Sequence, residues 1–188
     1  MRLSEPRIPA VTDIESLEPE AREQLEATSL GPAVNIFRTL VNHPKLMKRW
    51  LVFANHILFK STLPPRDREL VILRIGWLCR AEYEWGQHVI IGKGAGLTDE
   101  EIPRITRGPD DPAWEPFDAT LLRATDELHA DAMLSNALWT ALSERYSTQQ
   151  LMDLVFTIGQ YALVSMALNS FGVQLDPGVS GFPEGAGA

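Results

Sequence analysis

Apolar residues recur at helical spacing along most of the chain. In residues 45–59 they fall three or four positions apart, as on one face of a helix, and Pro44 stands where a first helical turn tolerates proline. After Leu63-Pro64-Pro65 the apolar positions in residues 70–78 are too dense for a surface helix, so we expect a helix buried on most sides. No segment alternates apolar and polar residues between hairpin signals. The pattern therefore predicts an all-α protein.

Capping residues and glycines mark the ends of further helices. A helix over about residues 81–93 should end in a left-handed turn at Gly94-Ala95-Gly96. Two capping boxes are expected, one from Thr98 with Glu101 and one from Ser147 with Gln150. The helix that follows the second box, residues 148–171, is apolar nearly all round. Such a helix belongs in the centre of the fold or in a subunit interface.

The length and the distribution of proline and glycine indicate one domain. A chain of 188 residues can bury a core without metals or disulfides. Proline-rich residues 1–19 are expected to form an arm, residues 20–175 a single helical domain, and the small residues of 176–188 a flexible tail.

Charge and composition narrow the class of partner. Lys and Arg total 17 against 25 Asp and Glu, which gives a net charge of −8 without a basic cluster, so nucleic acid is not expected to bind. The single cysteine, the lack of a signal-peptide pattern and the lack of an apolar run of about 18 residues favour a cytoplasmic protein without a membrane segment. Arginines in residues 66–80 still allow a local positive charge for a small anionic substrate.

Three residues of two neighbouring helices carry the candidate chemistry. A single straight helix would hold Glu69 and His88 roughly 28 Å apart. A chain reversal in residues 78–82 would bring them together on antiparallel helices. Glu84 and His88 are four positions apart and face the same way. The residues therefore predict an imidazole between carboxylates.

A carboxylate beside an imidazole orients the ring and raises its basicity, which suits proton transfer near neutral pH. We expect His88 to move the proton, Glu84 to orient it, and Glu69 to act as a second acid–base group. Two other interpretations remain open at this point. Glu84 with His88 also fits an ordinary surface pair, and Glu69 fits an acid that stabilises the first turn of its helix. No metal site is predicted, because a second imidazole or thiolate at ligand spacing is missing.

The chain resembles the carboxymuconolactone decarboxylase family in three motifs, at residues 65–73, 79–88 and 95–98. The most specific part is R-E-L followed by E-Y-E-W-x-x-H. This family includes the alkylhydroperoxidase D proteins. The resemblance covers about residues 45–105, and residues 153–173 are similar to the family's C-terminal segment. It implies a helical fold with antiparallel central helices, assembly into trimers or hexamers, and a site near a subunit boundary.

The peroxidase branch of this family carries a Cys-x-x-Cys motif that this chain lacks. The two cysteine positions of that motif fall on Ala81 and Glu84, so a dithiol cycle is excluded. Cys79 is interpreted as a packing residue.

The resemblance thus implies a cofactor-free lyase of the decarboxylase type, acting by proton transfer on a small lactone or oxidised carboxylic acid. The alternatives are a single-thiol antioxidant protein and a non-catalytic ligand-binding or assembly protein. Weaker candidates for the pocket wall are His56, Arg74, Cys79, Tyr83 and Trp85.

Overall fold

The computed structural model describes residues 2–28 and 30–183, and within these residues it contains helices and no strand. The prediction of an all-α protein is confirmed. The elements in chain order are η1 (Ile14–Ser16, a 3-10 helix), α1 (Pro19–Glu26), α2 (Asn35–Leu40), α3 (Pro44–Phe59), α4 (Pro65–Leu78), α5 (Glu82–Gly94), α6 (Glu101–Arg107), α7 (Pro116–Asp131), α8 (Asn136–Ser143) and α9 (Thr148–Phe171).

The expected end signals are present in the structure. Ser147 and Gln150 form the capping box of α9. Thr98 Oγ1 accepts the backbone N–H of Glu101, whose carboxylate accepts the N–H of Thr98 in return. The turn after α5 is left-handed at Gly96, with φ +104°. The local sequence therefore determines where these helices begin and end.

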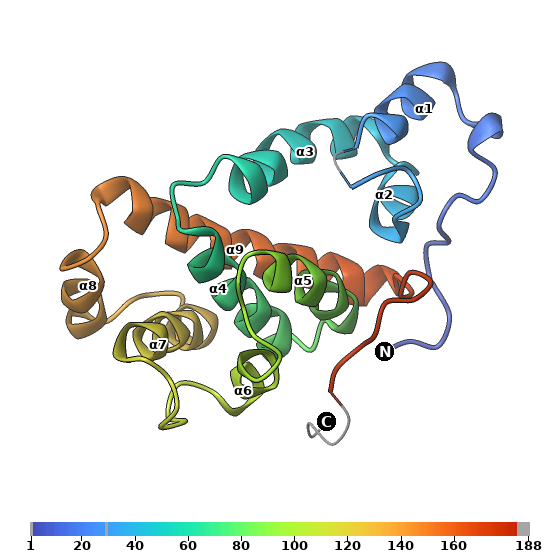
Figure 1. Ribbon diagram of the computed structural model, residues 1–188. Helices are drawn as coiled ribbons and strands as arrows, with labels where there is room; N and C mark the ends of the chain where they lie inside the picture. The colour runs from blue at the N-terminus through green and yellow to red at the C-terminus, as the bar shows by residue number, and fades with distance from the viewer. Residues whose placement is uncertain (1, 29, 184–188) are drawn as a thin grey trace.

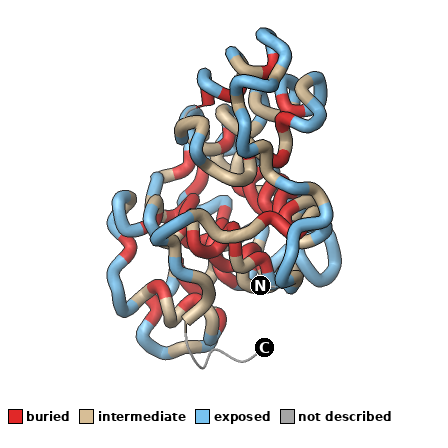
Figure 2. Tube along the Cα trace, turned by 90° about the vertical axis from the view of Figure 1, so that its right-hand side faces the viewer, coloured by how far each residue is buried: buried red, intermediate tan, exposed pale blue. Residues whose placement is uncertain are grey.

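The long helices α4 and α9 form the centre of the molecule. Figure 1 shows α9 running across the middle, with α4 and α5 on one side and α3 on the other. Helices α6 and α7 cover α4, and α8 packs on α7 and α9. Figure 2 shows that buried residues gather towards the middle of the molecule, with exposed residues on the outer segments. Every residue from Asp67 to Gly76 is buried, as the dense apolar pattern predicted.

The charged residues in buried α4 have specific partners. Arg74 binds the Asp126 carboxylate through Nε and Nη2, and its Nη1 donates to the carbonyl of Ile105. Asp67 accepts a hydrogen bond of 2.6 Å from the Tyr146 hydroxyl. These contacts offset the cost of removing charge from water and tie α4 to its neighbours.

Helix α9 is long and apolar enough to cross a membrane by length and composition. The expectation that the chain lacks an apolar run of about 18 residues is therefore wrong. Half of its most apolar window is buried inside the molecule. Central helices of compact folds have the same composition. The buried face of α9 packs on α4 and α5, and this placement brings its polar residues to the site described below.

The first and the last segments that the structure describes both contact the helical domain. The N–H groups of Arg7 and Ile8 donate to the carbonyl of Phe171, at the end of α9. Near the other end, the Phe182 ring packs edge-on against Trp77 and Trp85, with ring centroids 5.0 and 5.6 Å apart. The end of the expected flexible tail, residues 184–188, lies outside the described residues. The flexibility of the tail stays a prediction.

Candidate active site

The reversal between α4 and α5 places the candidate side chains opposite one another. Helix α4 ends at Leu78, Arg80 turns the chain with φ +52°, and α5 begins at Glu82. The N–H of Ala81 donates to the carbonyl of Gly76, which closes the turn. The predicted reversal is thus present, and α5 runs back along α4.

His88 bridges two carboxylates, one on each helix. Its Nδ1 lies 2.6 Å from Glu69 Oε2, and its Nε2 lies 3.0 Å from Glu84 Oε1. Arg68 Nε donates to the other oxygen of Glu69 at 3.0 Å. The Glu69 side chain has no exposed surface, and those of His88 and Glu84 are about 6% and 5% exposed. The three residues therefore form a buried row with Arg68 behind Glu69.

This environment favours the charged form of His88. Burial opposes the charge, but the negative charge of Glu69 and the hydrogen bonds to Glu69 and Glu84 outweigh it and raise the pKa of His88 to about 10. Burial likewise opposes ionisation of Glu69, and the positive charges of His88 and Arg68 hold its pKa below the ordinary value. A doubly protonated imidazole donates from both nitrogens, as two acceptors require. At neutral pH the row therefore contains an imidazolium.

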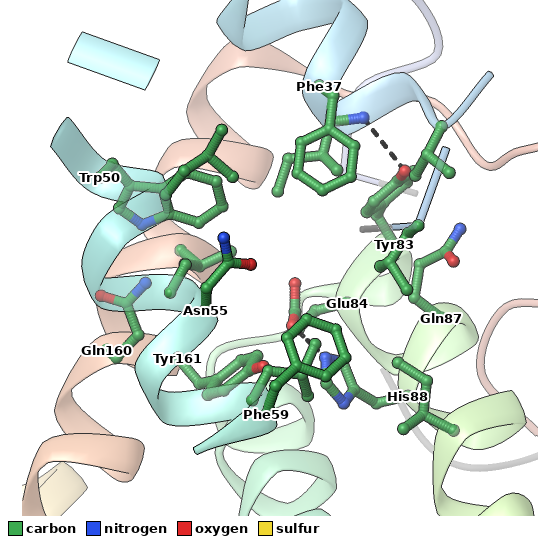
Figure 3. Close-up of a pocket in the computed structure, with 18 residues that line it drawn as sticks. Phe37, Trp50, Asn55, Phe59, Tyr83, Glu84, Gln87, His88, Gln160 and Tyr161 are labelled. Carbon is green, nitrogen blue, oxygen red and sulfur yellow. Dashed lines mark hydrogen bonds and ion pairs between the residues drawn. The ribbon is translucent and has the colours of Figure 1, made fainter. Parts of the chain in front are cut away.

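A cavity of about 70 Å³ opens beside this row, between α2, α3, α5 and α9. Figure 3 shows Glu84, His88 and Tyr161 together on one side of the cavity, with Trp50 and Phe37 across from them. Glu84 and His88 line the cavity, whereas Glu69 does not. The residues that line it are Leu30, Val34, Ile36, Phe37, Trp50, Leu51, Ala54, Asn55, Leu58, Phe59, Tyr83, Glu84, Gln87, His88, Ile91, Gln160, Tyr161 and Val164.

Polar groups in an otherwise apolar wall can orient a ligand. Asn55, Gln87 and Gln160 bring amide groups to the cavity from three helices. The Tyr161 ring meets the His88 ring edge-on at 4.8 Å between centroids. Burial, followed by the negative charges of Glu84 and Glu69, raises the pKa of Tyr161 well above its ordinary value, so the phenol stays neutral.

Sequence reasoning missed Asn55, Gln87, Gln160 and Tyr161 as cavity residues. Asn55 interrupts the apolar pattern of α3, which is a usable signal in hindsight. Gln160 and Tyr161 lie in the segment that resembles the family's C-terminal helix, but spacing alone did not connect α9 with α5.

Asp176, in the segment after α9, fixes part of the cavity wall. Its carboxylate accepts hydrogen bonds of 2.6 Å from both the Tyr83 hydroxyl and Gln87 Nε2, and one of 2.9 Å from the N–H of Asn35. The Tyr83 hydroxyl in turn accepts the N–H of Ile36 at 3.1 Å. Asp176 therefore joins α5 to the start of α2 at the edge of the cavity.

The weaker candidates are placed differently from one another. Tyr83 lines the cavity. The structure corrects the expectation for the other four, because none of them lines the cavity. His56 is half exposed and faces Asp153 at 3.4 Å, and Arg74 binds Asp126. Cys79 lies 3.9 Å from His129 Nδ1, and Trp85 packs against Trp77 and Phe182. Each has a packing or pairing partner away from the cavity, which local sequence cannot reveal.

No group of three or more His, Cys, Asp or Glu side chains that could hold a metal ion occurs in the part of the chain that the structure describes. The residues of the cavity are instead suited to hydrogen bonding and proton transfer.

Comparison with known proteins agrees with this architecture. Residues 44–127 match the model of the carboxymuconolactone decarboxylase family. This range includes Glu69, Glu84 and His88. No curated protein matches the chain significantly.

Three solved structures share the fold at low sequence identity. An alkylhydroperoxidase AhpD core, an uncharacterised peroxidase-related protein from Ralstonia eutropha JMP134, superposes with a TM-score of 0.79 at 15% identity, over 92% of this chain and 93% of its own. An uncharacterised peroxidase-related protein from Silicibacter sp. TM1040 gives 0.75 at 13% identity, over 92% and 94%. A protein of unknown function from Agrobacterium tumefaciens, proposed to be the antioxidant defence protein AhpD, gives 0.68 at 18% identity, over 76% and 97%.

These similarities agree with the resemblance expected from the motifs and with the observed helices. Residues 44–127 are therefore similar to the carboxymuconolactone decarboxylase family, and the chain has the fold of the alkylhydroperoxidase D-like structures, as its motifs predicted.

Proposed function

We propose that this protein is a cofactor-free acid–base enzyme of the decarboxylase type, acting on a small lactone or oxidised carboxylic acid. The family match and the related folds support a function that is either decarboxylase-like or antioxidant. The observation that favours the first is the row from Glu69 through His88 to Glu84, which ends at the cavity wall. Such a row can move a proton between the protein and a bound ligand.

Position in the row suggests a role for each residue. Glu84 lies at the cavity and acts as the group that exchanges a proton with the substrate. His88 supplies the proton and a positive charge. Glu69, which does not line the cavity, holds the ring through Nδ1. This assignment exchanges the roles of Glu69 and Glu84 that the sequence suggested, because only Glu84 lies where a substrate can reach it.

In the proposed reaction, the bond between the substrate carbon and its carboxylate breaks and carbon dioxide leaves. The electron pair remains on the substrate as an enolate, whose negative charge the His88 imidazolium stabilises. His88 then passes its Nε2 proton to the Glu84 carboxylate, and the carboxylic acid so formed protonates the enolate carbon. His88 recovers a proton from water, so one proton is consumed for each carbon dioxide released.

The cavity restricts the substrate. None of the described residues that line it is Lys or Arg, so His88 is its source of positive charge. The anionic substrate expected from sequence stays a prediction. On this proposal one carboxylate is accepted beside His88, and the amide of Gln160 in the cavity wall binds an uncharged lactone oxygen.

Substitution of the row tests the proposal. We expect Glu84→Gln and His88→Gln each to lower turnover by about 10²–10⁴-fold, because general acid–base catalysis contributes about that much. The measurement is carbon dioxide release from a panel of carboxylated γ-lactones and β-keto acids, with deuterium incorporation from D2O as a second readout.

His56→Gln is the matched control, because His56 also faces a carboxylate but lies away from the cavity. It should retain turnover. Turnover within about twofold of wild type in both Glu84→Gln and His88→Gln, with unchanged helicity, would remove the row from the mechanism. A wild-type protein that binds panel members but turns over none would instead favour the non-catalytic ligand-binding alternative.

The second candidate is a single-thiol antioxidant, which the peroxidase-related fold relatives favour. In that reaction the Cys79 thiolate attacks a peroxide oxygen, becomes a sulfenic acid and releases an alcohol. The environment opposes it, because burial raises the pKa of the Cys79 thiol and Cys79 does not line the cavity. We expect Cys79→Ser to leave carbon dioxide release unchanged. Peroxide consumption that requires a thiol reductant and disappears in Cys79→Ser would establish the antioxidant function.

A further inference from the structure

A second cavity, of about 110 Å³, adjoins the candidate active site. It lies between α2, α3 and α9, and its lining surface is apolar. Three side chains line both cavities: Ile36 from α2, Trp50 from α3 and Val164 from α9. The two cavities are therefore neighbours on either side of these side chains, and Trp50 is the largest part of what separates them.

The two cavities differ in chemistry. The first has Glu84 and His88 in its wall, together with the amides of Asn55 and Gln160. The second has no charged residue in its lining, and beyond the shared side chains it is bounded by residues such as Leu46, Leu163 and Ala167. A polar reacting end suits the first cavity, and a hydrocarbon segment suits the second.

We propose that the substrate is amphipathic, with a compact polar head at Glu84 and His88 and a short hydrocarbon tail that passes Trp50 into the apolar cavity. This inference rests on the proposed function and adds the substrate class. Each methylene removed from water should tighten binding about fourfold until the apolar cavity is filled. The tail would thus contribute affinity and select among substrates that share the same head.

A second copy of the chain is an alternative to a ligand tail as the occupant of the apolar cavity. Leu46 and Leu163 are about 49% and 55% exposed, so the cavity reaches the surface of the chain. A second copy of the chain could cover it in an assembly. The apolar cavity adjoins the polar site across Trp50, which favours the tail of a ligand, and the experiment separates the two occupants.

The experiment measures binding of a homologous series of uncharged lactones: γ-butyrolactone, γ-octalactone and γ-decalactone, by isothermal titration calorimetry. For the wild-type protein we expect γ-octalactone and γ-decalactone to bind at least about tenfold more tightly than γ-butyrolactone. Ala167→Leu fills the apolar cavity and should abolish this gain while leaving γ-butyrolactone unchanged, because Ala167 lines only the apolar cavity. Leu163→Gln, at a half-exposed position, should reduce the gain by making the lining polar.

The control is Ala137→Leu, an exposed position on α8 that lines neither cavity, which should bind the series as wild type does. In Glu84→Gln the lactone affinity should still increase with tail length, even where turnover is lost. Failure of the proposed catalysis can therefore be distinguished from failure of the proposed tail binding. Binding that is independent of tail length would overturn the inference. The inference would also be overturned if Ala167→Leu changed the assembly in sedimentation but kept the lactone affinities of wild type. The cavity would then be a subunit contact.

Discussion

At the residue scale, the molecule depends on a histidine whose two nitrogens both face carboxylates. Glu69 lies on one side of the ring and Glu84 on the other, and Arg68 supplies a further positive charge behind Glu69. Buried charges are costly unless they are paired, and here each has a partner of opposite sign. The consequence is a site whose protonation state is set by geometry and resists change near neutral pH.

The raised pKa of His88 predicts a specific pH dependence of stability. Its folded-state pKa of about 10 lies above the unfolded value of about 6.5, so the stabilisation is fully present below pH 6.5 and is lost as the pH rises towards 10. We expect the free energy of unfolding of wild type to exceed that of His88→Gln by a few kcal/mol at pH 6, and this difference to shrink by pH 10.

Urea denaturation of both proteins across this range measures the effect. His56→Gln, at the exposed histidine, should show no comparable change in the difference. A difference between wild type and His88→Gln that stays constant from pH 6 to 10 would show that His88 is not charged in the folded protein.

The sequence predicted part of this site for a physical reason. Helical periodicity and the predicted chain reversal determine which side chains of α4 and α5 face one another, so Glu69, Glu84 and His88 could be grouped. It could not predict that Glu84, and not Glu69, reaches the cavity, because that depends on how α3 and α9 pack around α5. The prediction that Arg74 lines the pocket failed for the same reason, since its partner Asp126 lies on α7, far from Arg74 along the chain.

At the element scale, the cavity exists because α2 and α3 cover a face that α5 and α9 provide. Asp176, which belongs to neither helix, joins α2 to α5 and adds to the direct hydrogen bond from the Ile36 N–H to the Tyr83 hydroxyl. Capping signals predicted where α6 and α9 begin, since a capping box is local in sequence. They gave no information on Asp176, whose partners are far away along the chain.

We therefore expect Asp176→Ala to loosen the start of α2. The variant leaves the Tyr83 hydroxyl, Gln87 and the N–H of Asn35 without this acceptor, which should lower the free energy of unfolding by about 1–3 kcal/mol. Amide hydrogen exchange in α2 should quicken by about tenfold or more, while exchange in α4 should change less.

Asp110→Ala is a suitable control, because Asp110 forms an exposed ion pair with Arg123 and its loss should change stability by less than about 1 kcal/mol. Exchange in α2 that is equally slow in Asp176→Ala and wild type would show that Asp176 does not hold this helix in place.

At the scale of the whole molecule, the fold buries α4 but leaves part of α9 uncovered. Met152, Phe156 and Met166 on α9 are each more than half exposed and line neither cavity, and the Phe156 ring packs edge-on against Phe53 of α3. An exposed apolar patch of this kind is typical of a surface that pairs with another. The fold itself was predictable from periodicity and from the family motifs. A partner for the exposed face of α9 was not, because amphipathicity alone does not identify one.

We predict that the protein forms a homo-oligomer through this face. Sedimentation should give a mass that is a multiple of 21.0 kDa, and Met166→Glu should shift it towards the monomer, because burying an unpaired charge in an interface is costly. Glu144→Gln, an exposed change on another surface, should leave the assembly intact. A wild-type protein that sediments only as a 21.0 kDa monomer would contradict the prediction.

The charged state of His88 is the claim on which the proposed chemistry depends, and ¹⁵N NMR of the histidine rings measures it directly. We predict that both ring nitrogens of His88 are protonated at pH 8 and that the ring loses a proton only as the pH approaches about 10. His56→Gln and His88→Gln spectra assign the signals. A His88 ring with one unprotonated nitrogen at pH 8 would contradict the account.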